Sequence, residues 1–99
     1  MHTEDVPTVI EGDYEWDEQK AALNLVKHGV SFPEAILALE DPQAIVTADD
    51  AYAERDVTLG LTPRSVLVVV STERGDHTRI ISARRASNHE ERSYQANRK

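Results

Sequence analysis

The sequence predicts an α+β fold in which two N-terminal helices precede an antiparallel β-meander of about four strands, and a C-terminal helix ends the chain. Three observations support this prediction. The helical segments and the strand segments are segregated along the chain instead of alternating. Short apolar runs with brief connections fill residues 44–83. Capping signals mark the beginning of each expected helix.

The first expected helix runs from Asp17, a good N-cap residue, to about His28, and Gly29 stands where a left-handed C-cap residue belongs. Tyr14 and Trp16 alternate with a polar residue, which predicts a short strand entering this helix. The apolar stripe expected to face the core consists of Ala21, Ala22, Leu25 and Val26.

The two other helices each begin at a capping box, in which a serine and a glutamate three residues later satisfy each other's backbone amides. Ser31 and Glu34 open the second helix, which should run to about residue 40. Ser87 and Glu90 open the last helix, which should run to about residue 97. Between them, residues 44–47, 54–61, 66–70 and 78–83 are expected to be strands, with a turn at residues 75–76.

The length of 99 residues predicts one domain. Residues 1–13 mix charge, proline and glycine and are expected to form a flexible N-terminal arm, in which residues 8–10 could be a short strand. Residues 14–99 are expected to be the folded domain. Cysteine is absent, no apolar run approaches the roughly 20 residues needed to span a bilayer, and the N-terminus has no signal-peptide pattern. These features predict a cytoplasmic protein without disulfides that does not bind membranes.

The net charge of −7 argues against nucleic-acid binding by the molecule as a whole, but the charge is unevenly distributed. Residues 1–73 carry four basic and fifteen acidic groups, whereas residues 74–99 carry seven basic and three acidic groups. A basic C-terminal quarter is compatible with a local phosphate site, and equally with a salt-bridged surface. The four histidines are scattered without metal-ligand spacing, and no glycine-rich phosphate loop is present, so we expect no metal and no cofactor.

Arginines gather on strands that we expect to lie close together. Glu54 and Arg55 begin one strand, whereas Arg79, Arg84 and Arg85 lie on or just after the last strand. Guanidinium groups near a carboxylate could hold a phosphodiester and stabilise the charge that develops during attack by the RNA 2′-hydroxyl. The same residues could equally pair across the sheet and only stabilise it. In a regular strand Arg79 and Arg84 face opposite sides, so both reach one site only if a bulge or the strand end reorients one of them.

Three further residues allow two interpretations each. Lys27 and His28 in the last turn of the first helix complement the helix dipole, but could also contact phosphate and carry a proton. Tyr94 lies one turn after the capping residue Glu90, and could pack its ring or offer its hydroxyl to a site. Spacing alone does not separate these interpretations.

Taken in order, the motifs resemble those of the BrnT family of bacterial toxins over about residues 14–94. The matching residues are Tyr14-Glu15-Trp16-Asp17, Lys20-Ala21, Asn24, Lys27-His28-Gly29-Val30-Ser31-Phe32, Glu34-Ala35, Asp41-Pro42, Glu54-Arg55, Gly60, Val66–Val70, Arg79-Ile80-Ile81-Ser82-Ala83-Arg84-Arg85-Ala86, Glu90 and Tyr94. Single pieces are common in unrelated proteins, but the complete set in this order is specific.

The resemblance implies a compact fold similar to RelE-type ribonucleases, metal-independent cleavage of RNA and growth arrest. It also implies a hetero-oligomer with a BrnA-like antitoxin, whose ribbon-helix-helix region would contact operator DNA on behalf of both proteins. The implied catalytic residues are His28, Glu54, Arg79, Arg84 and Tyr94, and the implied phosphate contacts are Lys27, Arg55 and Arg85. Arg79 and Arg84 would contact the phosphate, Glu54 would act as base or orienting group, and His28 or Tyr94 would donate the proton.

A second function of a different class is a toxin-fold module that has lost catalysis and only binds a protein partner through its basic C-terminal quarter. A housekeeping RNA-binding domain is disfavoured because the chain has only five aromatic residues, which leaves few for stacking on bases.

Overall fold

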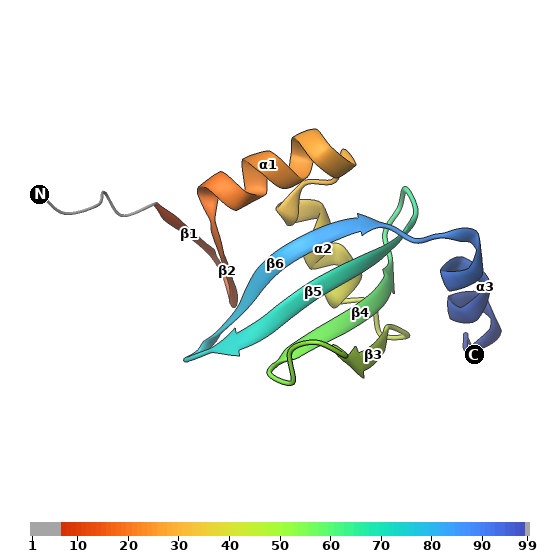
Figure 1. Ribbon diagram of the computed structural model, residues 1–99. Helices are drawn as coiled ribbons and strands as arrows, with labels where there is room; N and C mark the ends of the chain where they lie inside the picture. The colour runs from red at the N-terminus through yellow and green to blue at the C-terminus, as the bar shows by residue number, and fades with distance from the viewer. Residues whose placement is uncertain (1–6, 99) are drawn as a thin grey trace, which may run out of the picture.

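The computed structural model describes residues 7–98 and has three helices and six strands in that range. The elements in chain order are β1 (Thr8–Glu11), β2 (Tyr14–Asp17), α1 (Glu18–His28), α2 (Phe32–Leu39), β3 (Ile45–Ala48), β4 (Arg55–Leu61), β5 (Val66–Arg74), β6 (His77–Arg85) and α3 (Asn88–Ala96). Figure 1 shows α1 and α2 on one side of the sheet and α3 beyond the end of β6.

The six strands form one mixed sheet in the order β1-β2-β6-β5-β4-β3. Strands β3 to β6 form the expected antiparallel meander, but β1 and β2 extend it, and β2 runs parallel to β6. The prediction of two N-terminal helices followed by about four antiparallel strands is therefore wrong, because two strands precede the helices and the sheet is larger and mixed. The physical reason is the free edge of β6, whose backbone groups need partners once the meander has formed.

Two neighbours share the free edge of β6. Strand β2 pairs with its beginning, where Tyr14 lies opposite Thr78 and Glu15 lies opposite Arg79. Further along, the side chain of Asn24 on α1 replaces a strand: its amide nitrogen donates to the carbonyl of Ala83 at 2.8 Å, and its oxygen accepts from the Ala83 amide at 3.1 Å. A helix residue thus completes the hydrogen bonding of a strand.

This contact determines which face of α1 is buried. Asn24 is buried, whereas Leu25 and Val26 have 50% and 87% of their surface exposed. Ala22 is exposed as well, so the predicted apolar stripe of α1 is wrong for three of its four residues, and only Ala21 packs against the core. The periodicity of apolar residues suggested one face, but the two backbone groups of β6 select another.

The capping predictions are largely confirmed. Asp17 accepts from the amides of residues 19 and 20, Gly29 adopts the left-handed conformation with φ of 70°, and the box of Ser87 and Glu90 is complete. Ser31 accepts from the amide of Glu34, but no return bond from the Ser31 amide to the Glu34 carboxylate is found among residues 7–98, so this box is only half formed.

The main core lies between one face of the sheet and the helices α1 and α2. The buried residues of this core are Trp16, Val30, Phe32, Ala35, Ile36, Ala38, Leu67, Val69, Ile80 and Ala83. Trp16 and Phe32 pack edge to face with ring centroids 5.9 Å apart, so β2 and α2 are held together directly. At Gly60 a Cβ atom would lie 2.6 Å from the carbonyl carbon of Ala38, so α2 approaches β4 as closely as glycine permits.

The other face of the sheet, called here the open face, is only partly covered. Val66 and Val68 alternate with core residues and are buried outside the main cluster, as is Tyr94 of α3. Helix α3 contacts β4 and so shields one end of this face. Within residues 7–98 no helix is long and apolar enough to cross a membrane.

The predicted N-terminal arm falls partly outside the described residues, since residues 1–6 are not among them. Residues 8–11 form β1, and Val9 packs against the core cluster. The boundary at residue 13 stays a prediction.

Candidate functional site

A bulge in β6 brings distant arginines to the same face of the sheet. Val70 lies opposite Ser82, but the next residue, Ser71, lies opposite Ile80, so Ile81 has no partner on β5. The extra residue changes the alternation, with the result that Arg79 and Arg84 both project from the open face. From the sequence, such a bulge, or the strand end, was required for Arg79 and Arg84 to reach the same side of the sheet.

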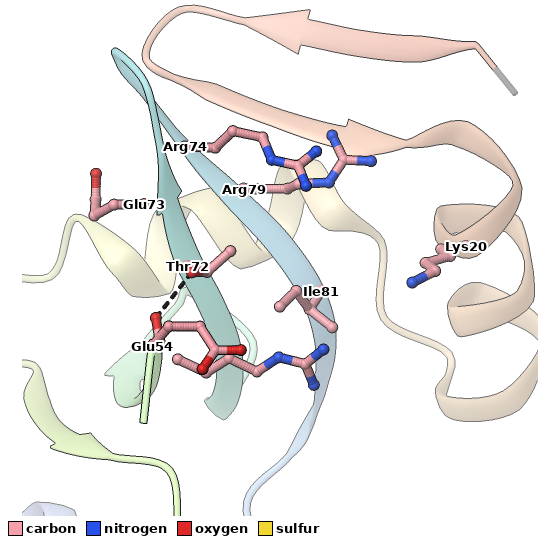
Figure 2. A pocket seen from close by; sticks show the side chains of 8 residues that line it. Lys20, Glu54, Thr72, Glu73, Arg74, Arg79 and Ile81 are labelled. Carbon is pink, nitrogen blue, oxygen red and sulfur yellow. Dashed lines mark hydrogen bonds between the residues drawn. The ribbon is translucent and has the colours of Figure 1, made fainter. Parts of the chain in front are cut away.

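A pocket of about 270 Å³ lies at one end of the open face (Figure 2). The residues that line it are Lys20, Glu54, Arg55, Thr72, Glu73, Arg74, Arg79 and Ile81. Four segments contribute: the beginning of α1, the beginning of β4, the end of β5 and the bulged part of β6. The structure thus brings together three of the predicted residues, Glu54, Arg55 and Arg79, and adds Lys20 and Arg74.

The pocket has more positive than negative groups. Four cationic side chains line it against two carboxylates, in a chain whose net charge is −7. Among residues 7–98, Lys20, Arg55 and Arg74 form no ion pair with an acidic side chain, so their charges are available to an anion. In Figure 2 the guanidinium groups of Arg74 and Arg79 point toward the same space. A phosphodiester fits this arrangement, because planar guanidinium groups bind phosphate oxygens in pairs.

Arg79 is held in place by a buried carboxylate that the sequence reasoning did not single out. Its Nη1 donates to Oε2 of Glu15 at 2.6 Å, and Glu15 has only 8% of its surface exposed. The other oxygen of Glu15 lies 3.7 Å from Nδ1 of His77. The available signal was the alternation of Tyr14 and Trp16, which turns Glu15 toward the face opposite the core.

The other wall of the pocket is tied to β5 through the backbone. The hydroxyl of Thr72 donates to the carbonyl of Glu54 at 2.8 Å, which fixes the point where β4 begins. Arg55 lies directly opposite Thr72 in the ladder, and its guanidinium carbon is 4.2 Å from the ring centroid of Tyr52. Glu54 therefore lines the pocket from a backbone position that β5 supports, next to Arg55 in the chain.

Arg84 and Tyr94 lie at the opposite end of the open face, where their hydrogen bonds attach α3 to the rest of the protein. Arg84 forms two hydrogen bonds with Glu90, at 2.9 and 2.8 Å. These bonds, working against burial, lower the pKa of Glu90 to about 2. The hydroxyl of Tyr94 donates to Oδ2 of Asp41, which also accepts from the amide of Leu61. Burial, followed by the bond to Asp41, raises the pKa of Tyr94.

The remaining predicted residues form a third group. Lys27 and His28 end α1, and Nη1 of Arg85 would lie 3.6 Å from a Cβ atom at Gly29, so Arg85 reaches the same helix end. None of the three lines the pocket. The catalytic and phosphate-binding roles of His28, Lys27 and Arg85 stay predictions.

The rest of the described structure offers less chemistry. Within residues 7–98 no group of three or more histidine, aspartate or glutamate side chains is arranged to hold a metal ion. A hollow on the outer side of α3 is lined by Asn88, Glu91, Arg92 and Gln95, all from a single helix. The pocket around Arg79 is therefore the candidate site.

Comparison with known families agrees with this chemistry. The family described as the ribonuclease toxin BrnT of a type II toxin–antitoxin system matches residues 16–90, which is most of the chain. No curated protein matches the sequence. The matched range includes all six charged side chains of the pocket, which are Lys20, Glu54, Arg55, Glu73, Arg74 and Arg79. The chain belongs to the BrnT family of ribonuclease toxins of type II toxin–antitoxin systems.

Proposed function

We propose that the protein is an endoribonuclease whose reaction takes place in the pocket around Arg79. The observation that supports this most directly is that one anchored arginine and three further cations, which have no acidic partner among residues 7–98, line the same pocket as Glu54. Excess positive charge stabilises a bound group most strongly when the negative charge of that group increases during the reaction. The phosphorus centre of RNA under attack is such a group.

In the proposed reaction the 2′-hydroxyl of one nucleotide attacks its own 3′-phosphorus. Glu54 accepts the hydroxyl proton, the new O2′–P bond forms, and the bond from phosphorus to the 5′-oxygen of the next nucleotide breaks. The products are a 2′,3′-cyclic phosphate and a 5′-hydroxyl. Arg79, Arg74 and Arg55 stabilise the phosphoryl oxygens. RNA supplies the nucleophile and the arginines supply the positive charge, so the reaction as written requires no metal.

The departing 5′-oxygen needs a proton, and we assign its donor to His77. This imidazole projects from the same face as Arg79, two residues earlier on β6, and contacts the same carboxylate, Glu15. The resemblance suggested His28 or Tyr94 as the donor, but His28 ends α1 and Tyr94 lies on α3. None of the three lines the pocket, and His77 is preferred because it shares Glu15 with Arg79. Replacing each histidine by glutamine separates the two assignments: His77→Gln should reduce cleavage strongly and His28→Gln should not.

The partner of a type II toxin is a protein antitoxin, and we propose that here it is BrnA-like. Its ribbon-helix-helix region would bind operator DNA, so that the hetero-oligomer represses its own synthesis while the toxin has no direct DNA contact. RNA and antitoxin would both meet this chain in the cytoplasm. A pull-down with a co-expressed BrnA-like chain, followed by an operator gel shift with and without each protein, tests these assignments.

The deciding experiment for catalysis uses the purified chain, a defined RNA and EDTA. Fragments ending in 2′,3′-cyclic phosphate, and resistance of an RNA with 2′-deoxy at the cleaved nucleotide, would support the mechanism. Loss of cleavage in Arg79→Ala would assign it to this pocket. Cleavage that requires added Mg²⁺, or that survives in Arg79→Ala, would contradict the proposal.

A second function is a non-catalytic module that only binds its protein partner, and the observation that favours it is the net charge of −7. Strong overall negative charge opposes the approach of RNA. Absence of cleavage with and without ribosomes, in a preparation shown to be free of antitoxin, would favour this function.

A further inference from the structure

One exposed aromatic side chain lies beside the pocket and has no role in the core. Tyr52, in the connection between β3 and β4, has 50% of its surface exposed. The guanidinium carbon of Arg55 lies 4.2 Å from its ring centroid, a cation–π contact. Arg55 also lines the pocket, so one side chain touches both the aromatic ring and the phosphate site.

Hydrogen bonds within the connection hold the backbone that carries Tyr52. The carboxylate of Asp49 accepts from the amide of Ala51 at 2.8 Å, and the amide of Arg55 donates to the carbonyl of Tyr52 at 3.0 Å. The amide of Asp49 donates to the carbonyl of Arg55 at 3.1 Å, which closes the loop at its base. The backbone that carries the ring is therefore ordered before a ligand arrives, which lowers the entropic cost of binding there.

The surroundings of the ring leave room for a flat ligand. The residues on either side, Ala51 and Ala53, are small and exposed. One guanidinium lies over the ring, and half of the tyrosine surface remains in contact with water. An aromatic ring together with an arginine plane is the surface on which single-stranded nucleic acids stack their bases.

We propose that Tyr52 and Arg55 form a nucleobase subsite, in which the base of a nucleotide beside the scissile phosphate stacks on this pair. The inference rests on the proposed function, since it places the phosphate in the pocket around Arg79. Arg55 joins the two parts, with its guanidinium against the ring and its side chain in the pocket wall. The ligand class is an unpaired base of single-stranded RNA, because a base inside a duplex has no free face to offer.

The test measures binding of a fluorescein-labelled single-stranded RNA that carries 2′-deoxy nucleotides and so resists cleavage. A second oligonucleotide lacks the base at the position next to the pocket-bound phosphate, found by scanning one abasic site along the strand. The proteins are the full chain, Tyr52→Ala, Tyr52→Phe, and Leu23→Ala as a matched control. Leu23 is an exposed apolar residue on α1 that does not line the pocket.

Tyr52→Ala should weaken binding by about 5-fold to 100-fold, the range for loss of one base–aromatic stack. Tyr52→Phe and Leu23→Ala should stay within about twofold of the unchanged chain, since stacking uses the ring and not the hydroxyl. The abasic strand should bind the unchanged chain more weakly by a similar factor, and Tyr52→Ala should show little further loss with it. That non-additivity is the signature of a direct contact.

Three outcomes would overturn the subsite: equal binding by Tyr52→Ala, an abasic penalty that persists undiminished in Tyr52→Ala, or no binding of the oligonucleotide by the unchanged chain. Circular dichroism of each variant excludes unfolding as the cause of lost binding. Cleavage of an all-ribose strand is scored separately. Base-dependent binding without cleavage would support the subsite and contradict the proposed nuclease activity. Cleavage without dependence on Tyr52 would support the nuclease activity and contradict the subsite.

Discussion

The two ends of the open face contain the same kind of ion pair in different surroundings. At one end Arg79 pairs with Glu15 of β2, and at the other Arg84 pairs with Glu90 of α3. Both arginines come from β6, and the bulge at Ile81 gives them the same face. What differs is the charge around each pair, and this difference separates a candidate reaction site from a structural contact.

At the α3 end each carboxylate accepts hydrogen bonds from groups that hold the fold together. Glu90 receives two bonds from Arg84 and one from the amide of Ser87, so it caps the helix while it neutralises the arginine. Tyr94 and Asp41 form a second tie between α3 and the body of the protein. At the Arg79 end the neighbouring cations Lys20, Arg55 and Arg74 have no acidic partner among residues 7–98. A closed set of contacts stabilises a fold, whereas a surplus of one charge recruits a ligand.

The largest effect that tests this comparison is on cleavage. Arg79→Ala should lower kcat by about 10²-fold to 10³-fold, the usual cost of one group that stabilises developing charge. Arg84→Ala should leave kcat within about threefold while lowering the melting temperature, because Glu90 loses its partner. Single-turnover cleavage and thermal unfolding measured on both variants check this. An equal loss of kcat in the two variants would remove the distinction between the two ends.

Glu15 should affect catalysis through Arg79. Glu15→Gln keeps the size of the side chain but weakens the hold on the guanidinium, and misplacement of a reacting group costs up to about 100-fold in rate. The loss should fall on kcat more than on KM, and Arg79→Lys combined with Glu15→Gln should lose little beyond Arg79→Lys alone. Additive losses would show that Glu15 acts independently of Arg79.

Tyr94 should matter for stability and little for cleavage. Tyr94→Phe removes the hydroxyl that donates to Asp41 and leaves a partly buried carboxylate with fewer donors, which costs about 1–3 kcal/mol. Urea unfolding gives the free energy of unfolding, and the same RNA gives the rate. A large loss of cleavage rate in folded Tyr94→Phe would instead support a catalytic role for this hydroxyl.

The smallest expected effect is on acid stability. Glu90 has a folded pKa of about 2 against an ordinary value of 4.5, so its contribution is fully present above pH 4.5 and is lost as the pH falls toward 2. Solvent screening limits the size of this contribution, since both partners are partly exposed. The free energy of unfolding of Arg84→Ala should therefore depend less on pH in this window. An unchanged pH dependence would show that the pair contributes nothing.

The local structure of this protein could be predicted from the sequence. The caps at Asp17 and Ser87, the left-handed residue Gly29 and the central strand beginning at Val66 all follow from neighbours within a few residues. The closeness of Glu54, Arg55 and Arg79 also followed, because the strands that carry them are only one strand apart in the meander.

Tertiary contacts decided the rest. Asn24 rotates α1 by binding Ala83, a residue 59 positions away, and the same edge of β6 takes β2 as a parallel neighbour, which delivers Glu15 to Arg79. The bulge at Ile81 and the placement of Tyr52 beside Arg55 likewise depend on how strands meet. Periodicity and capping patterns indicate the contacts that a residue makes within its own segment. The partners of an open strand edge and of a charged side chain come from segments far along the chain, and only the folded structure shows which ones they are.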